Sequence, residues 1–277
     1  MRRPDEALIV VEGMIRRFGG FTAVDVPYLE IPRDKITALI GPNGAGKTTM
    51  FNLLTGFDSP NEGKWRFDSQ PLEGLPAYRV ARLGMVRTFQ LTKVLGKLTV
   101  LQNMLLGADQ PGERLQRALL RPLWITQHRH EIDRARELLV RFGLDAKKDD
   151  HAASLSGGQR KLLEMARALM ARPKLLMLDE PMAGVNPALT QTLVEHIMTL
   201  PAEGIDVLFV EHDMHVVKHM AQHVVVMADG KIVAEGEPRG TLAEQAVVDA
   251  YLGSHHDVNL REVLDQRAAM RAKGVEA

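Results

Sequence analysis

Short, almost continuous hydrophobic runs alternate along the chain with segments of helical periodicity. Residues 36–40, 174–178 and 206–210 form three such runs, and none shows the polar–apolar alternation of a half-exposed strand. Strands that are apolar on both faces are typical of a parallel sheet covered by helices on both sides. Residues 47–55 follow the first run with the spacing of a helix, which Gly56 would end. The pattern therefore predicts an α/β fold.

Two other regions have different patterns. Near the N-terminus, residues 7–11 and 64–67 are typical of antiparallel strands. Further along, residues 99–107 and 131–142 have helical spacing, and an arginine-rich stretch separates them. We interpret residues 91–159 as a helical subdomain that is inserted into the α/β core.

These patterns predict one domain, residues 7–253, and a polar tail, residues 254–277. Within the domain, the α/β core would comprise residues 7–90 and 160–253. The tail has hydrophobic positions for at most a short helix, and we favour a solvated extension. The sequence shows no repeat of solenoid period and no low-complexity tract.

Bulk composition narrows the classes of function. The 277 residues are 45% hydrophobic and 25% charged, which is ordinary for a globular protein. Lys+Arg and Asp+Glu are equal at 35 each, so no basic excess indicates a nucleic-acid partner. The absence of cysteine excludes disulfides, thiolate catalysis and cysteine-ligated metals. No secretory signal is visible, and no apolar run approaches the roughly 20 residues of a spanning helix. If the protein works at a membrane, another chain must provide the membrane part.

A glycine-rich turn follows the first hydrophobic run. It fits the pattern G-x-x-x-x-G-K-[ST] and lies between an apolar strand and a helix, as a phosphate-binding loop requires. Its glycines let backbone N–H groups point at a phosphate, and the helix N-terminus adds to the attraction. We expect Lys47 to reach the β- and γ-phosphate oxygens of ATP, and the Thr48 hydroxyl to ligate Mg²⁺. The predicted ATP-binding residues of this loop are Gly41, Pro42, Asn43, Gly44, Ala45, Gly46, Lys47, Thr48 and Thr49.

The second hydrophobic run ends in two acidic residues, Asp179 and Glu180. A carboxylate at the carboxyl edge of a parallel sheet lies beside a phosphate loop at the same edge, where Asp179 can hold Mg²⁺ through water. Glu180 would then be aimed at the attacking water, as a base or a water-orienting group. Two solvated acids at a strand end are the alternative, which the phosphate loop upstream makes the weaker interpretation.

The segment Leu155-Ser156-Gly157-Gly158-Gln159 opens an amphipathic helix at residues 160–171. A serine cap and two glycine amides at a helix N-terminus can bind an anion. This segment is the signature motif of the ABC ATPases, and the chain resembles that family. The resemblance implies a RecA-like P-loop NTPase core with an N-terminal antiparallel β subdomain and an inserted helical signature subdomain. It also implies a head-to-tail dimer, in which Ser156, Gly157, Gly158 and Gln159 contact the γ-phosphate of ATP held by a second ABC ATPase subunit.

Other residues fall at functional positions of the family pattern. Gln90 corresponds to the glutamine that contacts Mg²⁺ or the lytic water, and His212 to the histidine that touches the γ-phosphate. Phe18 lies where the family stacks an aromatic ring on adenine. The resemblance thus implies catalytic roles for Glu180, His212, Gln90 and Lys47, and Mg²⁺ ligation by Thr48, Gln90 and Asp179. Two departures are Phe18, where tyrosine is commoner, and Asn186, where most ABC proteins place aspartate.

Several segments resemble the ATPase subunits of branched-chain amino acid importers, the LivG type. They include residues 53–57, 86–90, 98–104 and 211–214, and the ending Ala250-Tyr251-Leu252-Gly253. This resemblance implies two ATPase subunits beneath two transmembrane permease subunits, at the cytoplasmic face of the membrane, fed by a substrate-binding protein. The cargo would be branched-chain or other hydrophobic amino acids, although amides and urea are open to related systems.

Alternatives remain on the sequence alone. An exporter or a lipid-extraction ATPase would carry the same core motifs. A soluble ABC protein of ribosomes, DNA or iron–sulfur assembly would normally show a second cassette, a long coiled coil or cysteines, and none occurs here. His212, His215, His219 and His223 have helical spacing that could face a metal, but we assign His212 to the phosphate site instead. The arginines between Arg114 and Arg136 are interspersed with acids, which favours a solvated face over lipid headgroup binding.

Overall fold

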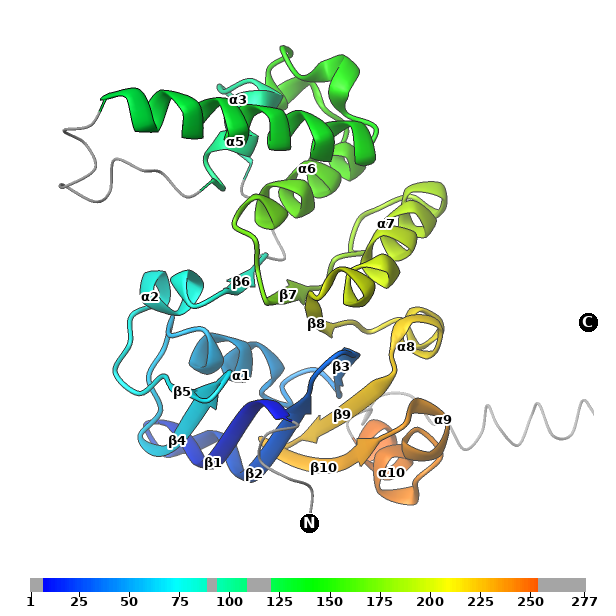
Figure 1. Ribbon diagram of the computed structural model, residues 1–277. Helices are drawn as coiled ribbons and strands as arrows, with labels where there is room; N and C mark the ends of the chain where they lie inside the picture. Colours follow the sequence, from blue (N-terminus) through cyan, green and yellow to red (C-terminus); the bar gives the residue numbers. More distant parts are fainter. Residues whose placement is uncertain (1–6, 89–93, 109–120, 254–277) are drawn as a thin grey trace, which may run out of the picture.

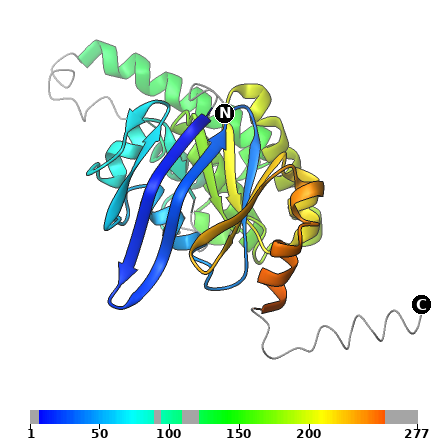
Figure 2. The same ribbon diagram turned by 90° about the horizontal axis from the view of Figure 1, so that it is seen from below.

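The structure is a computed structural model, and it describes residues 7–88, 94–108 and 121–253 (Figure 1). Within these residues the strands form two sheets. The first sheet is antiparallel in the order β2-β1-β4-β5. Its strands are β1 (Ala7–Phe18), β2 (Phe21–Pro32), β4 (Glu62–Phe67) and β5 (Gln70–Pro71). Figure 2 shows the long β1–β2 hairpin lying across the underside of the molecule.

The second sheet has the order β10-β9-β3-β8-β7-β6. Its neighbours pair in parallel, except that β10 pairs antiparallel with β9. The central strands are the three hydrophobic runs that the sequence pattern predicts as parallel strands. The strands are β3 (Ile36–Ile40), β6 (Met85–Arg87), β7 (Leu175–Asp179), β8 (Asp206–Val210), β9 (His223–Ala228) and β10 (Lys231–Gly236).

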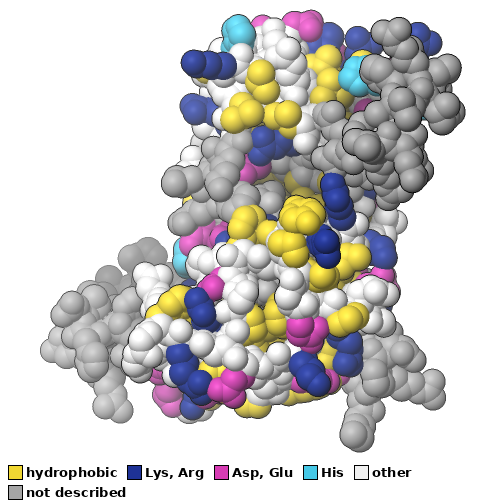
Figure 3. Space-filling model, turned by 90° about the vertical axis from the view of Figure 1, so that its left-hand side faces the viewer, with side chains coloured by type: hydrophobic (Ala, Val, Ile, Leu, Met, Phe, Trp, Pro, Cys, Tyr) yellow, Lys and Arg dark blue, Asp and Glu magenta, His cyan; other side chains and the backbone are white. Residues whose placement is uncertain are grey.

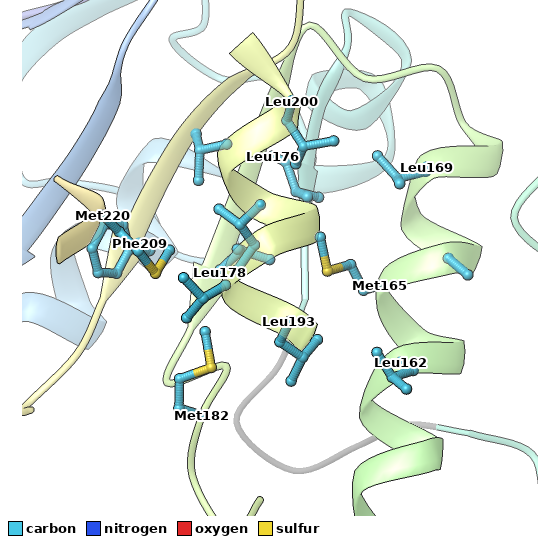
Figure 4. Packing of buried hydrophobic residues seen from close by; sticks show 14 of the residues in the cluster. Leu162, Met165, Leu169, Leu176, Leu178, Met182, Leu193, Leu200, Phe209 and Met220 are labelled. Atoms are coloured by element: carbon cyan, nitrogen blue, oxygen red, sulfur yellow. The ribbon is translucent and has the colours of Figure 1, made fainter. Parts of the chain in front are cut away.

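The parallel sheet is buried on both faces because alternate residues of each strand enter two different cores. Leu175 and Met177 of β7 pack towards the antiparallel sheet and helix α1 (Lys47–Leu54). Leu176 and Leu178 point the other way, towards α6 (Gly157–Met170) and α7 (Pro187–Thr199) (Figure 4). The absence of polar alternation in these strands follows from this double coverage.

Three helices pack together at one end of the molecule: α3 (Val100–Leu105), α5 (Arg121–Arg141) and α6 (Figure 1). The helix predicted at residues 131–142 is the second half of α5. The predicted boundary between residues 159 and 160 falls inside α6. The remaining helices are α2 (Ala77–Arg82), α8 (Met214–Met220), α9 (Pro238–Thr241) and α10 (Gln245–Gly253). Among the described residues, no helix is long and apolar enough to cross a bilayer.

Candidate functional site

The glycine-rich turn connects β3 to α1 and has a backbone that other residues would strain. Gly41 has φ 151°, and a Cβ placed there would lie 2.0 Å from the Met227 carbonyl oxygen. Gly46 has φ 98°, and its Cβ would lie 2.4 Å from the Ala23 carbonyl oxygen. The loop is thus held between β9 and β2, and both glycines allow a close approach of backbone to backbone.

Lys47 is the first residue of α1, and its side chain folds over the loop. Its Nζ donates hydrogen bonds to the carbonyl oxygens of Gly41 at 2.7 Å and Pro42 at 2.8 Å. Burial lowers the pKa of Lys47, whereas the charges of Glu180 and Asp179 raise it. The turn therefore presents one buried cation beside two carboxylates from a distant part of the chain.

Asp179 ends β7 and is paired with an arginine from the neighbouring strand. Its Oδ2 accepts a hydrogen bond from Arg87 Nη2 at 2.7 Å, and both side chains are buried. Arg87 ends β6, and its Nη1 also donates to Asn52 Oδ1 of α1 at 2.6 Å. No motif in the sequence predicts a role for Arg87. The only signal was a charged residue at the end of a strand, a common feature that does not identify a partner 92 residues away.

Glu180 and His212 meet because β7 and β8 are parallel neighbours. Asp179 pairs with Val210 in the sheet register, so the residues that follow leave the sheet at the same edge. Glu180 Oε1 lies 2.5 Å from His212 Nε2. Glu180 has φ 48°, a backbone conformation uncommon for a residue with a side chain. The structure thus brings together two residues for which the family resemblance implies separate catalytic roles.

The signature segment caps helix α6. Ser156 Oγ accepts a hydrogen bond from Gln159 N at 3.2 Å, and Gln159 Oε1 accepts one from Ser156 N at 3.0 Å, which is a capping box. The two glycines differ. A Cβ on Gly158 would lie 2.3 Å from Leu189 Cδ1 of α7, whereas a Cβ on Gly157 would meet nothing within 4 Å. A side chain at Gly158 would displace the Leu189 side chain, whereas Gly157 is exposed and open to a ligand.

The other predicted positions are only partly described. The ring of Phe18 is 49% exposed, and the Arg16 guanidinium lies 4.4 Å from its centroid. Arg16 is held in turn by Asp58, with both contacts at 2.9 Å. Gln90 lies outside the described residues. Asn186 caps helix α7 and accepts a hydrogen bond from Leu189 N at 3.0 Å.

The four histidines with helical spacing do not all lie on one helix. His212 precedes α8, His215 and His219 lie within α8, and His223 begins β9. Among the described residues, no group of three or more histidine or acidic side chains is arranged to hold a metal ion.

Comparison with known proteins places this site in a family. The family described as ABC transporter matches residues 25–183, which include the phosphate loop, the signature segment and Asp179–Glu180. The chain belongs to the ABC transporter family. The predicted fold class is confirmed by this membership and by the two sheets.

Relatives of this ABC protein are named as ATP-binding proteins of branched-chain amino acid transport. It is 40% identical over 251 residues to the high-affinity branched-chain amino acid transport ATP-binding protein LivG of Escherichia coli K12, covering 90% of this chain and 98% of that protein. It is 38% identical over 247 residues to the probable LivG of Archaeoglobus fulgidus, covering 89% and 96%. A crystal structure of the ADP conformation of an ATP-binding cassette of an ABC transporter has a TM-score of 0.77 and 36% identity, covering 89% of this chain and 99% of that one.

The oxygen atoms of the ABC site suit the Mg²⁺ that the family implies. Asp179 supplies a carboxylate and Thr48 a hydroxyl, and both are ligand types that Mg²⁺ prefers. Arg87 occupies one carboxylate oxygen of Asp179, which leaves the other as the candidate ligand. The third predicted ligand, Gln90, belongs to the segment that is not described.

Proposed function

We propose that this ABC protein is the ATP-hydrolysing subunit of an importer for branched-chain or other hydrophobic amino acids. The observation that carries the proposal is the group formed by Lys47, Asp179, Glu180 and His212 at the carboxyl edge of the parallel sheet. This group combines a phosphate-binding cation with a carboxylate–imidazole pair, as hydrolysis of a phosphoanhydride requires. The cargo class comes from the relatives, whose names specify branched-chain amino acid transport.

In this proposal, the chain binds ATP through the phosphate loop and stacks adenine on Phe18. Lys47 and the backbone amides stabilise charge on the β- and γ-phosphates. Bound Mg²⁺, held by Thr48 and Asp179, would neutralise part of the charge on the phosphate oxygens. Glu180 orients the attacking water or accepts its proton, and His212 holds the Glu180 carboxylate in place.

The signature segment provides the second half of the site in a head-to-tail dimer. Ser156 and the exposed Gly157 lie at the N-terminus of a 14-residue helix, where amide N–H groups and the helix dipole favour an anion. Helix α6 itself packs against α3 and α5. Because its N-terminus has the features of an anion site, we propose that this helix end contacts the γ-phosphate bound by a second ATPase subunit.

The face that carries α2 is our candidate for contact with the membrane permeases. Figure 3 shows hydrophobic side chains on this face, with Lys and Arg side chains among them. Tyr78 of α2 is 56% exposed, and Phe57 is 58% exposed. The two residues lie on adjoining segments, because a Cβ on Gly56 would lie 3.2 Å from Ala77 N. Exposed aromatic residues next to arginines are typical of a protein–protein interface. This arrangement supports contact with the permeases, and the proposed importer role would place that contact at the cytoplasmic side of the membrane.

Two experiments test the proposal separately. For hydrolysis, the full chain with Glu180→Gln should bind MgATP like wild type but turn it over at least about 100-fold more slowly, the scale of loss for a group of this kind. An unchanged turnover would remove Glu180 from its role. For the cargo, the chain should be purified with its co-isolating membrane proteins and reconstituted in liposomes. ATP-dependent uptake of leucine or another hydrophobic amino acid is expected, and uptake of none from a full panel would refute the import assignment.

A further inference from the structure

Glu211 is a buried acid that the proposed mechanism does not use. It lies between Val210, the last residue of β8, and His212, and it is 5% exposed. Burial raises the pKa of its carboxyl, and hydrogen bonds from the backbone of Met182 and His212 act in the opposite direction. Burying a carboxyl group costs free energy unless its oxygens are satisfied, so its contacts indicate what it does.

Both carboxyl oxygens of Glu211 accept backbone hydrogen bonds next to the catalytic pair. Oε1 accepts from Met182 N at 2.9 Å, in the segment that follows Glu180. Oε2 accepts from His212 N at 3.2 Å, in the residue whose ring contacts Glu180. One side chain therefore fixes the backbone on both sides of the pair.

The contacts close a ring around the catalytic pair. Glu180 N donates to the Val210 carbonyl oxygen at 3.0 Å, which anchors the start of the turn on β8. The turn continues to Met182, which Glu211 holds; Glu211 also holds His212, and His212 returns to the Glu180 carboxylate. Because Glu180 has a left-handed backbone conformation, the turn depends on such contacts to keep its shape.

We propose that Glu211 is a positioning residue for ATP hydrolysis, which sets the geometry of the Glu180–His212 pair through the backbones of Met182 and His212. The inference rests on the proposed function, in which this pair acts on the attacking water. The chemistry of the contacts explains why the residue is a glutamate. Both partners are N–H donors, and an ionised carboxylate accepts from both, whereas the amide of a glutamine would present its own N–H groups to one of them.

The test compares the full chain carrying Glu211→Gln with a matched control, Asp206→Asn. Asp206 begins β8, is buried, and accepts a backbone hydrogen bond from Lys35 N at 3.1 Å, but it lies at the opposite end of the strand. Thermal unfolding, the Kd for MgATP and kcat at saturating ATP should be measured for each. We expect Glu211→Gln to lower kcat about 10- to 100-fold, the scale of a displaced catalytic group, with little change in Kd. Asp206→Asn should leave kcat at the wild-type value, whichever way the melting temperature moves.

A second variant and a mutant cycle keep the outcome decisive. Glu211→Asp retains the charge but is one methylene too short to reach both amides. It should therefore show the loss of kcat expected for Glu211→Gln, and it replaces that variant if Glu211→Gln does not fold. In a His212→Ala background, Glu211→Gln should lower kcat by a smaller factor than in wild type, because one of the two groups that it positions is gone. Equal kcat losses for Glu211→Gln and Asp206→Asn, or full additivity with His212→Ala, would overturn the positioning role. Wild-type protein that neither binds nor hydrolyses MgATP would instead refute the proposed function.

Discussion

Replacing Arg87 by methionine should destabilise the protein, because it leaves the buried carboxylate of Asp179 unpaired. Arg87 and Asp179 form an ion pair at 2.7 Å, with side chains only 5% and 9% exposed. Methionine keeps most of the side-chain volume but removes the guanidinium. The Asp179 carboxylate is then left buried without its partner. Such a residual charge, rather than lost packing, is the main cost of breaking a buried pair.

The expected magnitude follows from this burial. Removing one partner of a buried pair costs about 3–5 kcal/mol. Lys47 remains close enough for Asp179 to raise its pKa, so it compensates part of the charge. We therefore expect a loss of about 2–4 kcal/mol in the free energy of unfolding. For a domain of this size, each kcal/mol shifts the melting temperature by about 2–4 °C, which gives a decrease of about 5–15 °C.

Thermal unfolding followed by circular dichroism measures this effect. The double variant Arg87→Met/Asp179→Asn should recover at least half of the loss, because the uncompensated charge is removed. A matched control is Arg17→Met, which breaks the pair with Glu62 in which the side chains are 46% and 56% exposed. Such exposed pairs contribute at most about 1 kcal/mol. If Arg87→Met melted like the Arg17 control, or if Asp179→Asn gave no recovery, the buried-charge explanation would be wrong.

Three further predictions concern separate features. Phe18→Ala should weaken ATP binding about tenfold or more in a fluorescent-nucleotide assay, the loss of one base–aromatic stack, and Phe18→Tyr should not; equal affinities for all three proteins would exclude stacking on Phe18. Gly46→Ala should destabilise the protein more than Gly44→Ala. Both glycines have positive φ, but only a Cβ at Gly46 would clash with backbone, at 2.4 Å from the Ala23 carbonyl oxygen. Equal melting temperatures for the two variants would contradict this. Burial and then the Arg141 charge lower the pKa of His196 below 6.5, so the free energy of unfolding should fall as the pH drops from 6.5 towards the folded-state pKa. His196→Phe should flatten that decline, and an unchanged pH profile of stability in this variant would contradict the assignment to His196.

Much of the fold and of the phosphate site can be predicted from local sequence patterns. The three central strands are recognisable because burial on both faces leaves no polar positions, and the phosphate loop because its glycines have backbone angles or close contacts that exclude side chains. The signature helix is predicted from its amphipathic spacing behind a serine cap, and in the structure Ser156 and Gln159 form that cap within four residues. Each of these features depends on residues near one another in the sequence, so a short segment contains its signal.

The sequence by itself determined the three central strands, the helix that follows the first of them, the phosphate loop and the acids at the end of β7. Only the tertiary structure decided which side chains meet at the edge of the sheet. Arg87 pairs with Asp179 across two strands, and Glu211 holds Met182 from the loop after β8. Neither contact has a sequence signal, because a buried charged residue resembles an exposed one until its partners are known. The partners come from parallel strands far apart in the chain, and the packing of both sheet faces sets their register.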